Sequence, residues 1–171
     1  MGYRDRWYER VSKYEAERRF EDWKDSNMST EEISKDYYWK DSKEYAGEIV
    51  KNEIIKPAFK ELRQKDYICR MNFLCCGGCA TSELSVMAKE REKLGGIYWH
   101  NQEEERRIQN RSLMFGFLSL EDNTSTTDVG NHLTETLQRH INSSQLPVKI
   151  EWDGSPAKKI ELSWKNDYTK V

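Results

Sequence analysis

Residues 67–79, YICRMNFLCCGGC, mark the point at which the sequence changes character. The first eight of these residues alternate with a period of two, which predicts a β-strand over residues 67–74. The two glycines that follow allow a tight turn, and the next residues predict a helix over about residues 81–94, ended by the Gly95–Gly96 pair. The stretch therefore predicts a strand–turn–helix unit with cysteines at its turn.

Downstream of this unit, short apolar segments alternate with helical patterns. The last two segments alternate cleanly between apolar and polar residues, and the turn sequence DGSP at residues 153–156 joins them, which predicts a β-hairpin. The predicted elements are a strand over 96–100, a helix over 101–109, a strand over 112–120, a helix over about 127–141, and hairpin strands over 148–152 and 160–164.

Residues 1–66 contain no cysteine, and aromatic residues at helical spacing interrupt their dense alternating charges. A capping pattern at Asp41 and Glu44 opens a long predicted helix, which Pro57 should kink or divide because it lacks an amide donor. The apolar stripe of that helix is predicted to be Tyr45, Ile49, Ile54, Ala58, Phe59 and Leu62. We therefore expect an α+β (mixed α/β) fold, with a helical N-terminal region over residues 1–66 and a domain over residues 67–171 that contains a small sheet and a cysteine-rich loop.

Composition and charge exclude several classes of protein. The 171 residues include 28 Lys and Arg against 30 Asp and Glu, so the formal net charge is −2 and a general nucleic-acid binder is disfavoured. The mean hydropathy is −0.97, yet 12% of residues are aromatic, so a packed core is expected. No apolar run approaches the roughly 18 residues that span a bilayer, and the N-terminus has no secretory signal. We expect a cytoplasmic protein with reduced cysteines and no membrane partner.

All four cysteines lie between positions 69 and 79. Cys69 and Cys75 share the parity of the apolar strand residues, so a buried packing role is expected for both. Cys76-Gly-Gly-Cys79 joins the strand to a helix N-terminus, where the helix dipole lowers the pKa of a thiol. This arrangement is typical of thioredoxin-like redox pairs, whereas a purely structural glycine turn is the alternative.

The same segment is half of a zinc-binding signature. Cys76 and Cys79 have the spacing of a zinc knuckle, and Cys75 could substitute for either. His100 ends the neighbouring predicted strand, so it could reach the same end of the sheet. Glu83, expected on the first turn of the following helix, could orient His100 or act as a general base on zinc-bound water. The candidate metal ligands are therefore Cys76, Cys79 and His100, with Glu83 beside them.

The order of these features resembles a family of uncharacterised bacterial proteins that is classified as a domain of unknown function, over about residues 69–164. The matching residues are Cys75, Cys76, Gly77 and Cys79, then Glu83, then Tyr98-Trp99-His100, Phe115-Gly116, Ile150-Glu-Trp152-Asp153-Gly154 and Trp164. Ala80 departs from a second glycine of that pattern, and Glu103 stands near its acidic position after the histidine. The resemblance implies a fold and a candidate locus at Cys76, Cys79, Glu83 and His100, but no reaction.

No complete catalytic signature is present, since the sequence has no Walker loop, Gly-x-Gly-x-x-Gly, Gly-x-Ser-x-Gly or His-Glu-x-x-His motif. This favours a non-enzymatic protein-interaction or regulatory factor, including a defence- or immunity-related one, whose partner is another protein or a second copy of the chain. The predicted interface anchors are Trp7, Tyr8, Trp23, Tyr37, Tyr38 and Trp39. The alternative is a thiol redox or zinc-dependent enzyme centred on the Cys76–Cys79 loop and His100.

Overall fold

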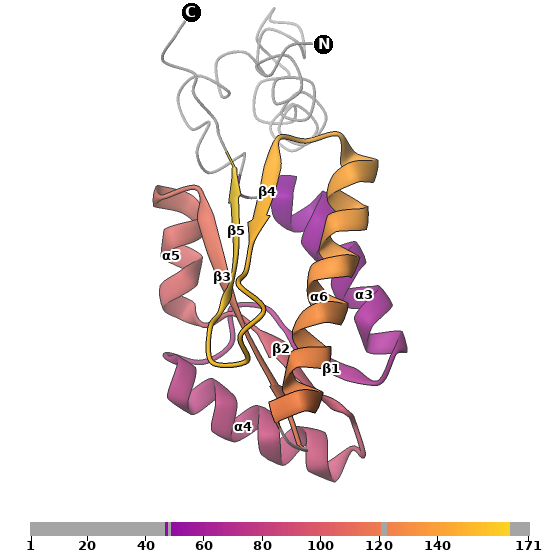
Figure 1. The fold of residues 1–171 in the computed structure, drawn as a ribbon. Coiled ribbons are helices and arrows are strands. Elements are labelled where there is room, and N and C mark those ends of the chain that lie inside the picture. The colour runs from indigo at the N-terminus through magenta and orange to yellow at the C-terminus, as the bar shows by residue number, and fades with distance from the viewer. Residues whose placement is uncertain (1–46, 48, 121–122, 165–171) are drawn as a thin grey trace, which may run out of the picture.

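The computed structural model describes residues 47, 49–120 and 123–164, and it confirms the expected α+β fold (Figure 1). A five-stranded mixed sheet has the strand order β1-β2-β3-β5-β4. In that sheet β1 and β2 run parallel, whereas the other neighbouring strands pair antiparallel. The elements are η1 (Lys51–Ile55), α3 (Lys56–Gln64), β1 (Tyr67–Arg70), α4 (Gly77–Glu90), β2 (Gly95–Tyr98), α5 (Asn101–Gln109), β3 (Ser112–Ser119), α6 (Asn123–Ser144), β4 (Val148–Glu151) and β5 (Ile160–Trp164).

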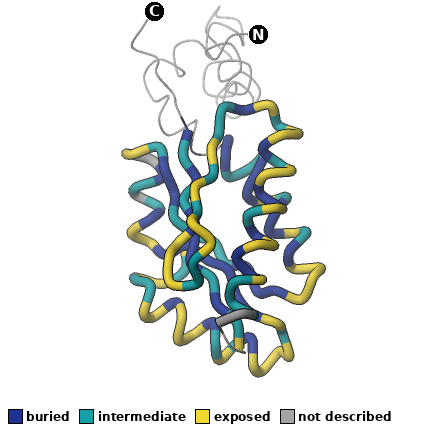
Figure 2. The backbone as a smooth tube through the Cα atoms, in the orientation of Figure 1, coloured by how far each residue is buried: buried dark blue, intermediate teal, exposed yellow. Residues whose placement is uncertain are grey.

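Helices cover both faces of the sheet. On one face, η1, α3 and α6 bury their apolar sides against the strands, and on the other face α4 packs on Ile68, Tyr98 and Leu118. Helix α5 lies along β3. Figure 2 shows that the buried residues follow the strands and the inner sides of the helices. Among the described helices, none is long and apolar enough to cross a lipid bilayer.

Three rings form the centre of the larger core. Phe59 of α3 lies 5.8 Å from Trp99 and 5.9 Å from Phe115, and the Trp99 and Phe115 centroids are 5.8 Å apart. All three side chains are fully buried, and each contributes on the order of 1.5–3 kcal/mol through its apolar burial. Described residues on both sides of position 66 therefore share one hydrophobic core.

The expected interruption near Pro57 is confirmed. Pro57 lies in the first turn of α3, and the π-helical turn η1 directly precedes it. The Lys56 amide donates to the Lys51 carbonyl, five residues back, so residues five apart stack on one face. Every residue of the predicted apolar stripe that the structure describes is buried. Tyr45 lies outside the described residues. Val50 and Ile55 are buried as well, because the wider turn brings them onto the same face.

Several predicted boundaries are wrong. Strand β1 ends at Arg70 rather than at residue 74, because Asn72 and Leu74 take left-handed φ values of 51° and 60°. Helix α4 begins at Gly77, before the expected start near residue 81, and ends at Glu90. The Gly95–Gly96 pair does not end that helix but forms the first half of β2.

The C-terminal prediction is confirmed, since β4 and β5 form an antiparallel hairpin that pairs Val148 with Trp164. The strand expected over residues 112–120 is β3, and the helix expected over residues 127–141 is α6, which is longer at both ends.

Candidate functional site

The cysteine loop lies between β1 and α4, at the carboxyl end of β1. Because β1 and β2 are parallel, the carboxyl end of β2 adjoins this loop (Figure 1). Two backbone hydrogen bonds tie the loop to the segment after β2: Phe73 N–H donates to Trp99 O at 2.7 Å, and Asn101 N–H donates to Leu74 O at 2.9 Å. The loop is therefore held by hydrogen bonds to the residues that directly follow β2.

A side chain strengthens this anchor. The Asn101 amide, with its nitrogen turned toward the loop, donates to the carbonyl oxygens of Asn72 and Leu74, each at 3.1 Å. These carbonyls belong to the two left-handed residues, whose irregular backbone cannot satisfy its acceptors within a sheet. The sharp course of the loop directs Cys75 back toward the start of α4.

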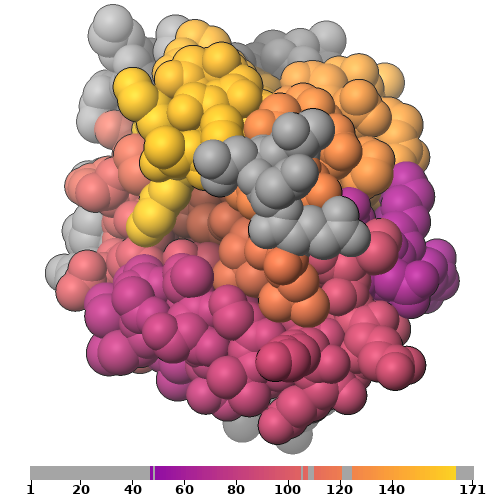
Figure 3. Space-filling model, turned by 60° about the horizontal axis from the view of Figure 1, so that its bottom comes forward, coloured from indigo at the N-terminus to yellow at the C-terminus, as the bar shows by residue number. Residues whose placement is uncertain are grey.

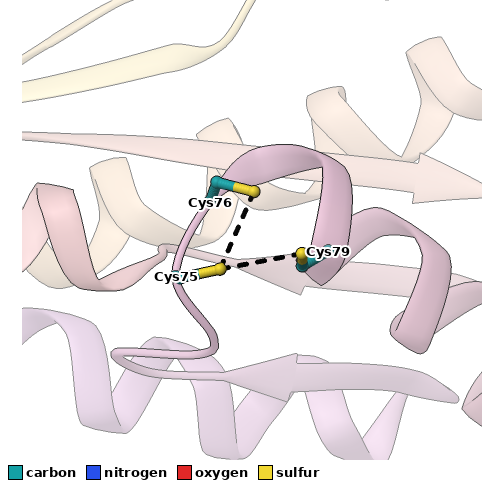
Figure 4. Close-up of side chains that lie close together, drawn as sticks. All are labelled: Cys75, Cys76 and Cys79. Carbon is teal, nitrogen blue, oxygen red and sulfur yellow. Dashed lines mark hydrogen bonds between the residues drawn. The ribbon is translucent and has the colours of Figure 1, made fainter.

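Three thiols gather at this point. The Cys75 sulfur lies 3.9 Å from the Cys76 sulfur and 3.6 Å from the Cys79 sulfur, and all three sulfurs are within 4.8 Å of one another. Figure 4 shows Cys75 in the loop facing Cys76, which precedes α4, and Cys79 on the first turn of that helix. Cys75 and Cys79 are exposed and Cys76 is half-buried. Among the described residues, this is the one group of three or more Cys, His, Asp or Glu side chains that could share a metal ion.

The thiols of the pair Cys76 and Cys79 differ in acidity. The backbone N–H of Cys79, followed by the thiols of Cys79 and Cys75, lowers the pKa of Cys76 below its ordinary value. The same contact with Cys76 raises the pKa of Cys79 to about 11. Cys76 is thus the first of the two to become a thiolate, as expected for a thiol at a helix N-terminus.

Cys69 lies apart from this group. It is buried in the larger core, as predicted, and burial raises its pKa to about 12. The packing role expected for Cys75 is wrong, because β1 ends five residues before it and its side chain is exposed. The sequence therefore placed Cys75 in the wrong environment, and its true neighbours are the other two thiols of the loop.

His100 precedes α5 as its N-cap residue and is buried. Its Nε2 atom lies 3.2 Å from Nζ of Lys159, whereas Nδ1 has no hydrogen-bond partner among the described residues. Burial, followed by the charge of Lys159, lowers the pKa of His100. The nitrogen atoms of His100 are not part of the group of three sulfurs.

Glu83 is exposed on the second turn of α4, because that helix starts earlier than expected. It does not belong to the thiol group either. Of the four residues proposed for the locus, the structure therefore brings Cys76 and Cys79 together, adds Cys75, and leaves Glu83 and His100 outside. The predicted interface anchors Trp7, Tyr8, Trp23, Tyr37, Tyr38 and Trp39 lie outside the described residues.

Sequence reasoning missed Tyr98 and Lys159 near the loop. The Tyr98 hydroxyl contacts Thr81 Oγ1 at 3.1 Å and donates to Gly77 O at 3.4 Å, which fixes the start of α4. Lys159 comes from the segment before β5 and has no sequence signal, since only the folded chain brings it to His100. For Tyr98, the one sequence feature that could have pointed to the loop is its position in the aromatic segment Tyr98-Trp99-His100.

Comparisons with known proteins agree with the resemblance drawn from the sequence. No curated protein and no solved structure matches the chain. The model of one family, described as "Domain of unknown function (DUF6891)", matches residues 4–168. The match extends beyond the region of the cysteine, histidine and tryptophan motifs and includes most of the N-terminal region. The chain belongs to the DUF6891 family.

Proposed function

We propose that this protein binds a thiophilic divalent metal ion, zinc(II) foremost, through the thiolates of Cys75, Cys76 and Cys79. The observation that carries the proposal is the separation of the three sulfurs, all within 4.8 Å of one another at the surface. Thiolate is the ligand that zinc most often takes in structural sites. The proposal assigns binding and no reaction.

The sulfur separations suit a single shared ion. Two sulfurs bound to one zinc at about 2.3 Å, with tetrahedral angles, lie roughly 3.8 Å apart. The separations of Cys75 from Cys79 and from Cys76, 3.6 and 3.9 Å, bracket that value. A [4Fe–4S] cluster fits less well, because each of its irons takes its own thiolate and the cysteine sulfurs then spread wider. The lowered pKa of Cys76 also favours the thiolate that a metal needs.

Metal content and free-thiol count test this proposal directly. We expect about one zinc per chain when the full chain is purified under reducing conditions without added metal. Cys79→Ser should lose the ion, whereas Cys69→Ala, which removes the thiol outside the group, should keep it. Wild-type protein that takes up no zinc when one equivalent is supplied would overturn the proposal.

A thiol redox role is a second candidate, favoured by the opposite pKa shifts of Cys76 and Cys79. The Cys76 thiolate would attack a small-molecule disulfide and displace one half as a thiolate. Cys79 would then attack the Cys76 sulfur, form the Cys76–Cys79 disulfide and displace the other half. The two protein thiols are oxidised, the small disulfide is reduced to two thiols, and the two protein protons end on those thiols.

The alkylation rate of each thiol against pH tests the redox role. Cys76 should react with an apparent pKa below the free-thiol value of about 8.5, and Cys76→Ser should remove that fast phase. Cys79→Ser serves as the matched control and should keep the fast phase. Three exposed thiols that all react with an ordinary pKa would exclude Cys76 as an activated nucleophile.

A protein-interaction role remains our prediction for the aromatic residues of the N-terminal region, as does the cytoplasmic location. Because a second copy of the chain is one expected partner, sedimentation of the wild type and of Trp7→Ala/Trp23→Ala tests the interface. A dimer that the folded variant loses supports it. A wild type that sediments as a monomer excludes a second copy as the partner.

A further inference from the structure

We propose that His100 is the fourth ligand of this zinc, and that the ammonium group of Lys159 donates a hydrogen bond to the imidazole nitrogen that would bind the metal. The proposal rests on the proposed function and deepens it, because it completes the ligand set and names a lysine that competes with the metal. A set of three thiolates and one imidazole is a common structural zinc site.

The inventory of soft ligands points to His100. The chain has four cysteines and three histidines, and all seven lie within the described residues. Cys69 is buried in the core, His132 Nδ1 lies 2.6 Å from the Tyr67 hydroxyl, and His140 Nε2 lies 3.0 Å from Glu61. The last two belong to α6, which covers the opposite face of the sheet from α4. His100 is the remaining soft donor.

The backbone around His100 is already attached to the cysteine loop. Tyr98, two residues before it, donates to Gly77 O, and the carbonyl of Trp99 accepts from Phe73 N–H. On the other side, Asn101 N–H donates to Leu74 O. The residues that flank His100 therefore contact the loop both before and after the adjacent cysteines 75 and 76. The backbone at His100 is therefore held beside the cysteine loop, which lowers the entropic cost of bringing the imidazole to the thiols.

The proton on the imidazole is on the correct nitrogen for a metal ligand. A lysine ammonium can only donate, so Nε2 of His100 must accept from Lys159 with its lone pair. The neutral ring then carries its proton on Nδ1. This is the tautomer that binds zinc through Nε2.

Lys159 occupies the imidazole nitrogen that the metal ion would bind. Its Nζ atom lies 3.8 Å from the place a Cβ would take on Gly77, so the ammonium stands between His100 and the start of α4. Figure 3 shows the hairpin segment that carries Lys159, in yellow, close to the surface of α4. Among the described residues, no carboxylate forms an ion pair with Lys159. Its long, exposed side chain can swing into solvent when zinc binds.

Zinc binding then exchanges one cation for another at Nε2. The three thiolates and the imidazole close on the ion, and the ammonium of Lys159 leaves Nε2 because the lone pair that accepted its hydrogen bond then binds the metal. The imidazole must turn toward the cluster, since its nitrogen atoms lie outside the group of sulfurs in the structure. Removing the ammonium of Lys159 should therefore tighten zinc binding, because no donor then competes with the metal for the Nε2 lone pair, whereas a merely structural lysine would not have that effect.

Titration of the full chain with zinc, and with cobalt(II) as a coloured stand-in, tests this inference. Lys159→Met should lower the zinc dissociation constant by about tenfold, since it removes one hydrogen bond that competes for Nε2. Lys158→Met, the neighbouring lysine paired with Asp153, is the matched control and should leave it unchanged. His100→Ala should weaken zinc by at least about tenfold and shift the cobalt d–d absorption bands away from those of a three-sulfur, one-nitrogen site.

His100→Cys guards against a variant that merely fails to fold, since a fourth thiolate should restore zinc binding with an all-sulfur cobalt spectrum. No zinc binding by the wild type would overturn the proposed function itself. Zinc binding that neither His100→Ala nor Lys159→Met alters would overturn this inference alone. Tighter binding in Lys159→Met with no change in His100→Ala would also overturn it, because Lys159 would then not act through the nitrogen of His100.

Discussion

Gly95 lets two strands approach more closely than any side chain would allow. A Cβ at this position would lie 2.1 Å from the carbonyl oxygen of Leu118 in β3, which is a clash with backbone. A Cβ added to Gly78, at the exposed start of α4, would have no atom within 4 Å outside its own helix. The two glycines share a residue type but not a role, and the second has space for a methyl group.

The first prediction contrasts these two glycines. Gly95→Ala should lower the free energy of unfolding by at least about 2 kcal/mol, because the backbone of β3 must shift to admit the methyl group. Gly78→Ala should change it by less than about 1 kcal/mol, since alanine favours the helix. Urea unfolding of both variants measures the difference. Equal stability of the two would contradict the close approach of β2 and β3.

The helices α3 and α6 are joined by a charge cluster at their exposed edge. Glu61 of α3 accepts from Arg139 and contacts His140 of α6 at 3.0 Å. The contact with Arg139, followed by that with His140, lowers the pKa of Glu61 from 4.5 to about 2. Because the folded pKa is the lower one, the pair stabilises the fold above about pH 4.5 and loses that effect as the pH falls toward 2.

The second prediction follows from that sign. Glu61→Gln should cost up to about 1 kcal/mol at pH 7, the range of surface ion pairs, and the difference from wild type should shrink as the pH falls from 4.5 toward 2. Unfolding of the variant and the wild type across this pH range measures the effect. A constant difference at all pH values would contradict a depressed Glu61 pKa.

The elements also show what sequence patterns predict and what they miss. Local patterns predicted the existence of each described strand and helix after residue 66: a capping pattern for the charged helix over residues 101–109, and apolar periods for the strands. Boundaries failed where contacts between distant residues decide them. Gly95 belongs to β2 because β3 packs so close to it that a side chain at this position would clash. Strand β1 ends at Arg70 because hydrogen bonds from Asn101 hold the following loop away from a strand conformation.

The same division applies to the candidate site. Cys76 and Cys79 could be predicted as a pair from their spacing and from the helix that follows. Cys75 was misplaced because an extended strand pattern hid the turn at Asn72 and Leu74. Lys159 stands 59 residues from His100 in sequence, so only the folded hairpin reveals their contact.

At the scale of the whole molecule, the described residues before and after position 66 form one core. Phe59 of α3 packs directly on Trp99 and Phe115, which follow β2 and lie within β3. We expect a helical region over residues 1–66 and an α+β domain over residues 67–171. The described residues of both regions pack around the same three rings. Cooperative unfolding of helix and sheet follows, because neither side buries the rings alone.

The third prediction tests this cooperation. Phe59→Ala should lower the stability of the whole described fold by about 3–5 kcal/mol, as large-to-small changes at fully buried aromatics do. Helical circular dichroism and tryptophan fluorescence should report one coincident transition in wild type and variant. A milder Phe59→Leu variant keeps the comparison available if Phe59→Ala does not fold. Two separated transitions would contradict a single core.

The central claim is that the thiols of the cysteine loop hold one zinc ion. X-ray absorption at the zinc edge, on the full chain loaded with one equivalent of zinc, tests it most directly. We predict three sulfur neighbours at about 2.3 Å and one nitrogen neighbour at about 2.0–2.1 Å. A shell of oxygen and nitrogen neighbours without sulfur would contradict the claim, because zinc would then lie away from Cys75, Cys76 and Cys79.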